Sequence, residues 1–154
     1  VRSRRQRQMC IRDRLYSEKI AAEDMGIYLQ DPLGDLGRIQ AEMFRAVRLV
    51  VDTGMHAKGW SREKAIDYML LKTGMTEAEV VREIERYVVW PGQATAYKIG
   101  QLSIVRLRSL AEERLADDFD IREFHEMILL NGAMPLEILE ESVESWIDDQ
   151  KTLM

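Results

Sequence analysis

One amphipathic stretch limits the fold of this chain more than any other feature of the sequence. From Asp35 onward, apolar residues recur every three or four positions with charged residues largely between them, at Leu36, Ile39, Met43, Val47, Val50 and Val51. This spacing predicts a long α-helix with one apolar face. Gly54 is predicted to end it, because glycine tolerates the left-handed conformation of a helix C-cap.

The rest of the chain also favours helices. No stretch alternates apolar and polar residues for long enough to indicate a β-sheet. Five further helices are predicted from local signals. The first covers 15–29 and is ended by Asp31-Pro32, and the second runs from the N-cap Ser61 to Gly74. The other three run from the capping box at 76–79 to Trp90, over about 93–116, and from Asp120 to Asn131. With a last helix that begins at Pro135, the sequence predicts an all-α bundle of about seven helices.

The long helix over about 93–116 and the last helix carry apolar stripes that predict buried faces. One stripe runs along the long helix, and its members are Tyr97, Ile104, Leu107, Ala111 and Leu115. The other runs along the last helix, and its members are Leu136, Leu139, Val143, Trp146 and Ile147. Short connections predict that neighbouring helices pack roughly antiparallel, as a single domain over residues 15–150.

The N-terminal stretch 1–14 differs in composition from everything after it. It holds six arginines and one acidic residue, whereas the other 140 residues carry a net charge of −10. A basic arm for nucleic acid or anionic membrane is one interpretation. The string "RQRQMCIRD" is also similar to translated sequencing-adapter read-through. We interpret residues 1–14 as non-native or disordered and outside the fold; a targeting signal is excluded because no apolar segment of about 7–15 residues follows.

Composition excludes several classes of function. The acidic body argues against a nucleic-acid surface. No apolar run approaches the roughly 20 residues that a membrane-spanning helix needs. The single Cys10 excludes an internal disulfide framework. The bacterial cytoplasm, the periplasm and export all remain open.

The sequence contains no complete catalytic signature, so candidate residues rest on their local patterns. His56 follows an apolar run and precedes Trp60; near a helix C-terminus an imidazole can simply interact with free carbonyls. His125, between Phe124 and Glu126, is interpreted as a packing residue. The spacing of the two histidines does not match a zinc site.

A second group of candidates lies around the start of the long helix. Gln93 and Tyr97 are four residues apart and would share a helix face. Gly100 costs about 1 kcal/mol relative to alanine inside a helix, which indicates close packing or a ligand. The arginines of the first long helix are most simply a solvated or ion-paired face, and they are Arg38, Arg45 and Arg48.

Four strings together resemble a known family. They are "LYSEKIA", "GRIQAEMFRAVRLVVDTGMHAKGWSREKAIDYML", "VVREIERYVVWPGQATAYKIGQL" and "FHEMILLNGAMPLEILE". They resemble, in order over residues 15 to about 147, the C-terminal part of the bacterial family named domain of unknown function eight-eight-five. That family looks like a branch of helical zinc metallopeptidases, with an upstream H-E-x-x-P-G-H-H helix and an E-G-W-x-L-Y-S-E helix.

The resemblance implies roles for residues of this chain. His56 and Tyr97 would donate hydrogen bonds to the oxyanion that develops during peptide-bond hydrolysis, a contribution of several kcal/mol. Gln93 and Arg48 would hold substrate. The metal would be bound by the histidines and the leading glutamate of the two motifs.

The chain departs from the family pattern where the metal would bind. The string Leu15 to Glu18 matches L-Y-S-E, but the ligand glutamate falls at Ile11, and the upstream histidine motif is absent. The expected function is therefore that of a C-terminal fragment of a zinc-dependent peptidase, inactive and without zinc by itself. Its partners would be a peptide substrate and the missing N-terminal half, and exposed apolar surface predicts self-association. A non-enzymatic helical binding or scaffold module is the alternative.

Overall fold

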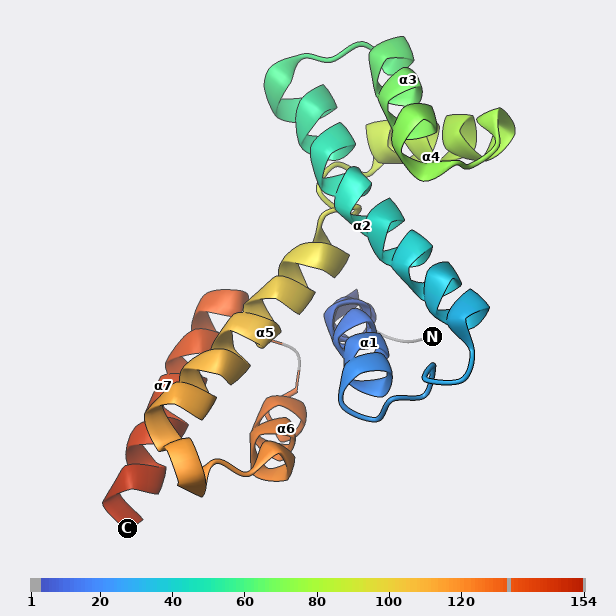
Figure 1. Ribbon diagram of the computed structural model, residues 1–154. Helices are drawn as coiled ribbons and strands as arrows, with labels where there is room; N and C mark the ends of the chain where they lie inside the picture. Colours follow the sequence, from blue (N-terminus) through green and yellow to red (C-terminus); the bar gives the residue numbers. More distant parts are fainter. Residues whose placement is uncertain (1–3, 133, 154) are drawn as a thin grey trace. The chain divides into compact units, whose positions relative to one another are not determined.

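The computed structural model describes residues 4–132 and 134–153, and within those residues it contains helices and no strand (Figure 1). The elements are α1 (Arg4–Glu23), α2 (Pro32–Lys58), α3 (Arg62–Thr73), α4 (Glu77–Val89), α5 (Ala96–Leu115), a 3₁₀ turn η1 (Ala116–Asp118), α6 (Ile121–Leu130) and α7 (Leu136–Leu153). The predicted all-α fold of about seven helices is confirmed. None of the described helices is both long enough and apolar enough to cross a membrane.

The chain divides into two compact units, and the divisions fall within helices α1 and α5. Unit 2 runs from Ser17 to Ile99 and contains α2, α3 and α4. Unit 1 combines the chain up to Tyr16 with the chain from Gly100 onward, and contains α6 and α7. Each unit has its own buried apolar residues, so the two are described separately below.

Local capping chemistry sets most helix boundaries. The Ser61 hydroxyl oxygen accepts a hydrogen bond from the Lys64 amide at 3.2 Å, and Gly74 ends α3 with φ of 64°. At α4 the Glu79 carboxylate accepts from the Thr76 amide at 3.0 Å, as a capping box requires. The Asp120 carboxylate accepts from the Arg122 amide at 2.7 Å. These four predicted signals are confirmed.

Helix α2 does not end at Gly54, which corrects the sequence prediction. It continues to Lys58, and the left-handed cap is Gly59, with φ of 64°. Gly54 is buried inside the helix, where an added Cβ would lie 2.7 Å from the indole ring of Trp60. Glycine is therefore required at 54 by the approach of the indole, and not by the turn.

Other boundaries also move by a few residues. Helix α1 begins at Arg4, before the expected start at Leu15, and ends at Glu23 instead of Leu29, because Gly26 takes a left-handed conformation. Residues 1–3 lie outside the described part of the predicted arm. Helix α2 begins earlier than Asp35, at Pro32, and α5 begins later than Gln93, at Ala96. Pro135 lies just before α7, and its carbonyl accepts the first helical hydrogen bond, from Leu139 at 3.0 Å.

The core of unit 2 forms where α2, α3 and α4 meet. Its buried residues are Val47, Val51, Ala65, Ile66, Met69, Val80, Ile84, Tyr87 and Ala94. Only Val47 and Val51 of the predicted α2 face are buried, whereas Leu36, Ile39, Met43 and Val50 are exposed. The C-terminal half of α2 packs on α3 and α4. In the N-terminal half, Leu36, Ile39 and Met43 remain about half exposed or more, because neither α3 nor α4 reaches them.

The core of unit 1 uses most of the two predicted stripes, but Leu136 and Trp146 are only half-buried and Tyr97 belongs to unit 2. Its buried apolar residues are Leu15, Tyr16, Ile104, Leu107, Ala111, Leu115, Phe124, Ile128, Leu139, Val143 and Ile147. Helices α6 and α7 are joined by ring packing between Phe124 and Trp146, whose centroids lie 6.2 Å apart. Arg106 of α5 pairs with Glu140 of α7 at 2.6 Å.

Candidate functional site

Three polar residues form a row along α2 in unit 2. Arg48, Asp52 and His56 are four residues apart, so their side chains lie on one face of the helix. All three form hydrogen bonds with residues in the stretch from Tyr87, in the last turn of α4, to Gln93, before α5. The row thus ties α2 to the segment that joins α4 and α5.

Arg48 is a buried cation surrounded by aromatic rings. Its side chain is 5% exposed, and its guanidinium carbon lies 4.6 Å from the ring centre of Tyr97, 5.4 Å from Tyr87 and 5.5 Å from Phe44. Burial lowers the pKa of this guanidinium from its ordinary value, and the neighbouring tyrosines oppose the shift. Arg48 is therefore not part of a solvated face, as the sequence had suggested; the rings of Tyr87 and Tyr97 enclose it.

Gln93 joins two cations in this cluster. Its Oε1 atom accepts from Nη2 of Arg48 at 3.3 Å and from Nη1 of Arg86 at 2.8 Å. Arg86 also pairs with Glu83 at 2.5 Å, and Glu83 accepts from the hydroxyl of Tyr87 at 2.6 Å. Gln93 lies in the turn before α5, so it does not share a helix face with Tyr97, but both residues contact Arg48.

The charges of the cluster shift the pKa of its acid and its phenol. Burial raises the pKa of Glu83, but hydrogen bonds from Arg86 and Tyr87 outweigh it, so the carboxyl is more acidic than usual. Burial and the bond to Glu83 raise the pKa of the Tyr87 phenol. Glu83 is therefore a carboxylate and Tyr87 a neutral donor at neutral pH.

Asp52 holds the loop that carries Gln93. Its side chain is 3% exposed, and both carboxylate oxygens accept from the Gly92 amide at 3.1 Å. Sequence reasoning missed Asp52, Glu83, Arg86 and Tyr87. Only Asp52 carried a signal, because an acidic residue four positions from Arg48 interrupts the apolar run before Gly54.

His56 contacts a backbone carbonyl. Its Nε2 atom lies 3.0 Å from the carbonyl oxygen of Tyr87, in the last turn of α4. A carbonyl oxygen only accepts hydrogen bonds, so Nε2 must carry the proton. His56 lies two turns from Arg48, about 12 Å along the helix axis. The structure brings Arg48, Gln93 and Tyr97 together, with His56 farther along the same row.

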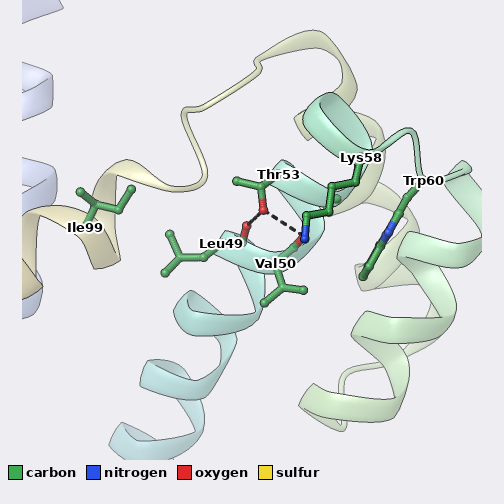
Figure 2. Close-up of a pocket in the computed structure, with 7 residues that line it drawn as sticks. Leu49, Val50, Thr53, Lys58, Trp60 and Ile99 are labelled. Atoms are coloured by element: carbon green, nitrogen blue, oxygen red, sulfur yellow. Dashed lines mark hydrogen bonds between the residues drawn. The ribbon is translucent and has the colours of Figure 1, made fainter.

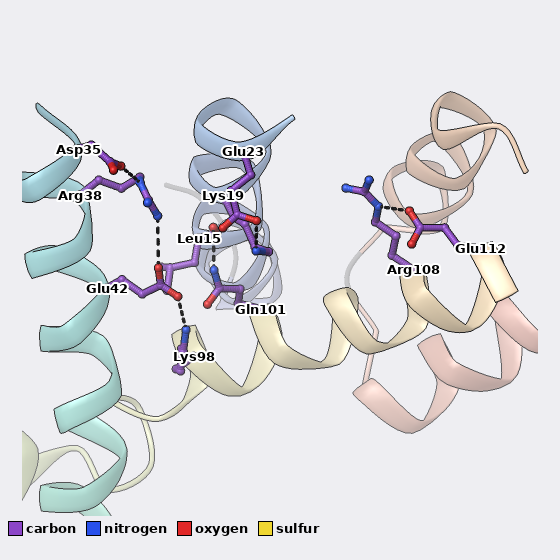
Figure 3. Close-up of polar contacts among 10 residues, drawn as sticks. All are labelled: Leu15, Lys19, Glu23, Asp35, Arg38, Glu42, Lys98, Gln101, Arg108 and Glu112. Carbon is purple, nitrogen blue, oxygen red and sulfur yellow. Dashed lines mark hydrogen bonds and ion pairs between the residues drawn. The ribbon is translucent and has the colours of Figure 1, made fainter. Parts of the chain in front are cut away.

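The N-terminal half of α2 carries an ion-paired network (Figure 3). Glu42 accepts from Lys98 at 2.5 Å and pairs with Arg38 at 3.4 Å. Arg38 also pairs with Asp35 at 2.7 Å, and Arg45 pairs with Glu18 at 3.7 Å. For Arg38 and Arg45, the ion-paired interpretation of the sequence is confirmed.

An apolar hollow of about 380 Å³ lies on another part of unit 2 (Figure 2). Its lining residues are Leu49, Val50, Thr53, Gly54, Lys58, Trp60 and Ile99. Neither His56 nor Tyr97 lines it. Because Lys58 is its one charged lining residue, it has few groups for acid–base chemistry.

The remaining candidates lie in unit 1. His125 is held by the hydroxyl of Tyr16, with Nε2 and the oxygen 2.9 Å apart, and its ring meets the Tyr16 ring edge-on. This matches the packing role predicted from the sequence. Gly100 is buried at the start of the unit 1 part of α5, and the neighbouring Gln101 donates to the Leu15 carbonyl at 3.2 Å.

The described residues do not fit a zinc ion. Among the side chains that the structure describes, in 13–132 and 134–152, there is no group of three histidine, cysteine, aspartate or glutamate residues placed to hold a metal. Asp52 and Glu83 are already engaged by the Gly92 amide and by Arg86. Chemistry at the Arg48 cluster is therefore limited to donating hydrogen bonds and binding negative charge.

Comparison with known proteins places the chain in a family. "The crystal structure of the putative lipoprotein from Colwellia psychrerythraea" matches with 58% sequence identity and a TM-score of 0.84, over 88% of this chain. The chain spans 23% of that protein's length. No curated protein matches significantly. The model of the family described as "Bacterial protein of unknown function (DUF885)" matches residues 14–143, so the chain belongs to this bacterial family.

Proposed function

We propose that the chain is the C-terminal part of a zinc-dependent peptidase, and that unit 2 provides the wall of the cleft that binds the peptide. The metal ligands belong to the rest of the longer protein, because the described residues hold no suitable group. The related Colwellia protein is about four times longer than the matched part, which leaves ample chain for a metal-binding half.

The gathering of the sequence-predicted residues carries this proposal. Arg48, Gln93 and Tyr97 come from α2, the α4–α5 connection and α5, yet they form one cluster. His56 extends the same row of α2. Donors and a cation along one row suit an extended peptide, which presents a carbonyl oxygen at each residue.

Each residue has a role that its surroundings allow. His56 and Tyr97 donate hydrogen bonds to the oxyanion, and Arg48 and Gln93 hold the substrate. His56 already donates from Nε2 to the Tyr87 carbonyl, so it serves an oxyanion only by turning away or by donating from a protonated Nδ1. Tyr97 is half-buried and packs against Arg48, and this contact limits the orientations that its ring can adopt.

An exposed apolar stripe also supports membership of a larger fold. Leu33, Leu36, Ile39 and Met43, here called the α2 stripe, are 79%, 60%, 47% and 50% exposed. Leu36 and Met43 continue the line of Val47 and Val51, which α3 and α4 cover farther along the same helix. In the intact protein, we assign the cover of the stripe to helices that precede this chain.

The test is carried out on the full-length protein that contains this chain. We expect about one zinc per molecule by elemental analysis, together with hydrolysis of a fluorogenic peptide. His56→Ala and Tyr97→Phe should each lower kcat by about 10²–10³, the usual loss for one oxyanion donor, with zinc retained. If both serve one oxygen, the double variant loses less than the product of the single losses.

Tyr68→Phe provides the matched control, because Tyr68 packs on Trp60 in the same unit and is not among the rings that contact Arg48. Its kcat should remain at the level of the unchanged protein. Full-length protein without zinc and without hydrolysis would leave the non-enzymatic binding module as the better description. Full activity in both site variants would reduce His56 and Tyr97 to structural residues.

A further inference from the structure

Arg48 is a buried cation whose hydrogen bonds are incomplete. Its Nε atom has no hydrogen-bond partner among the described residues. Its only hydrogen bond to a described residue, from Nη2 to Oε1 of Gln93, is 3.3 Å long, whereas charge-assisted bonds of this type are about 2.7–2.9 Å. A guanidinium that is 5% exposed would ordinarily have these groups satisfied.

The carboxylates of the neighbourhood leave Arg48 without an ion pair. Glu83 is committed to Arg86 and to the Tyr87 hydroxyl, and Asp52 to the Gly92 amide. In the described part of the chain, no carboxylate lies within ion-pair distance of Arg48. The aromatic rings compensate the charge through their faces, but they leave the N–H groups at the edge of the guanidinium open.

Gln93 stands where one oxygen of a carboxylate would bind. Its single Oε1 atom accepts from both Arg48 and Arg86, which is how one oxygen of an anion bridges two guanidinium groups. Gln93 is half-buried and lies outside the regular helices, in the connection between α4 and α5. Rotation of this side chain would uncover the Nε and Nη2 edge of Arg48 without disturbing either helix.

A purely structural role for Arg48 explains less. A residue that only ties α2 to the α4–α5 connection needs a close bond to that connection, and Asp52 already provides one, in which both carboxylate oxygens share the N–H of Gly92. It does not need a second cation bound to the same amide oxygen. Two guanidinium groups that converge on one neutral oxygen are instead typical of an anion site.

We propose that Arg48 and Arg86 bind the C-terminal carboxylate of a peptide, that Gln93 fills this site when no peptide is bound, and that the displaced Gln93 amide then contacts the bound peptide away from its carboxylate. This inference rests on the proposed function and names the end of the substrate that the cleft recognises. The carboxylate takes Nε and Nη2 of Arg48 with its two oxygens, and one oxygen replaces Gln93 at Nη1 of Arg86. Planar two-point pairing of this kind is specific to arginine.

Isothermal titration of the present chain tests binding without any hydrolysis. The probes are acetyl-Ala-Ala-Ala as the free acid, the same peptide as its C-terminal amide, and acetyl-Ala-Glu-Ala amide. We expect the free acid to bind at least tenfold more tightly than both amides. Equal binding of the free acid and the glutamate-containing amide would make the site a general carboxylate site, and would overturn the assignment to chain ends. Equal binding of all three, or of none, would overturn the inference altogether.

Variants at three positions sharpen the test. Arg48→Lys keeps the charge but loses the planar pairing, and should lose the tenfold preference. Gln93→Glu places a permanent carboxylate in the site, and should raise Tm while abolishing the preference. Gln93→Ala removes the competing oxygen and should keep or increase the preference for the free acid. If Gln93→Ala also abolishes binding, Gln93 is a required ligand group and its placeholder role is wrong.

Arg62→Lys is the matched control, because Arg62 pairs with the exposed Glu85 at 2.5 Å on another face of unit 2. It should leave peptide binding unchanged. If Arg48→Lys fails to fold by circular dichroism, the opposite outcomes expected for Gln93→Glu and Gln93→Ala still decide the inference. If the full-length protein contains no zinc or does not hydrolyse peptides, only the proposed function is overturned. The carboxylate site is tested separately, because its titration requires neither zinc nor hydrolysis.

Discussion

The Nε2 atom of His56 lies 3.0 Å from the carbonyl oxygen of Tyr87, and so joins the last turn of α2 to the last turn of α4. The Tyr87 carbonyl also accepts from the Trp90 amide at 3.2 Å, so the imidazole is a second donor to this oxygen and links the ends of two helices. We expect His56→Ala to lower the free energy of unfolding by about 0.5–1.5 kcal/mol, the net value of one hydrogen bond.

Urea denaturation of the isolated chain measures this loss. His56→Gln retains an N–H donor and should recover part of the stability. The contact would be unimportant for folding if His56→Ala unfolded at the same urea concentration as the unchanged chain.

Gly54 and Gly37 lie in the same helix, but substitution should affect them in opposite directions. A Cβ at Gly54 would lie 2.7 Å from the Trp60 indole, whereas a Cβ at Gly37 meets no atom within 4 Å. We expect Gly54→Ala to destabilise the chain by about 1–3 kcal/mol, the cost of overpacking. Gly37→Ala should stabilise it by about 0.5–1 kcal/mol, because alanine favours the helix. Thermal unfolding of the two variants checks this; a gain at both positions would show that Trp60 moves aside freely.

The α2 stripe should make the isolated chain self-associate, despite the −10 charge of its body. Exposed apolar side chains in one row favour association through burial of that row. Leu33→Lys combined with Leu36→Lys should shift sedimentation equilibrium toward monomer. Because added lysines bring the net charge closer to zero, charge repulsion between chains cannot explain this shift.

A control for that experiment is Leu71→Lys on α3, where the leucine is 78% exposed but lies outside the stripe. It should associate as the unchanged chain does. A monomer at every concentration of the unchanged chain would contradict the prediction.

Glu42 should make stability depend on acidity. The hydrogen bond from Lys98 lowers the pKa of this carboxyl; burial opposes the shift, and the positive charges of Lys98 and Arg38 add to it. Because the pKa is lower in the folded chain than in the unfolded chain, the contribution is present above about pH 4.3, the pKa of an ordinary glutamate. It is lost as the pH falls from there through the folded-state pKa.

Chemical denaturation of Glu42→Gln at several pH values tests this expectation. At pH 7 the variant should be less stable than the unchanged chain. The difference should shrink as the pH falls from about 4.3 through the folded-state pKa of Glu42, below which both chains are uncharged at this position. A difference that is independent of pH would mean that the carboxylate charge contributes nothing.

Part of the fold could be read from local sequence, because some signals act within one helical turn. Ser61, the Thr76–Glu79 box and Asp120 satisfy amide groups two or three residues away, so their capping roles follow from neighbours in the chain. The apolar stripe of α7 likewise predicted its buried face at Leu139, Val143 and Ile147.

The sequence also led to family membership and to four candidate residues, through specific strings that span most of the chain. It did not predict the partners of those residues. Arg48 was expected on a solvated face, yet it is enclosed by Tyr87 and Tyr97, which lie 39 and 49 residues away in the chain. Helical spacing tells which face a residue occupies, but not which other helix meets that face.

Gly54 shows, at a single position, the difference between what local sequence indicates and what tertiary packing decides. Its glycine identity and its place after an apolar run were visible in the sequence, and they indicated a helix end because glycine suits that conformation. The tertiary structure instead folds the chain back at Gly59 and brings the Trp60 indole onto Gly54. Local chemistry determined where α3, α4 and α6 begin. The packing of side chains across turns and between helices decided how far α2 extends and which of its residues meet at the Arg48 cluster.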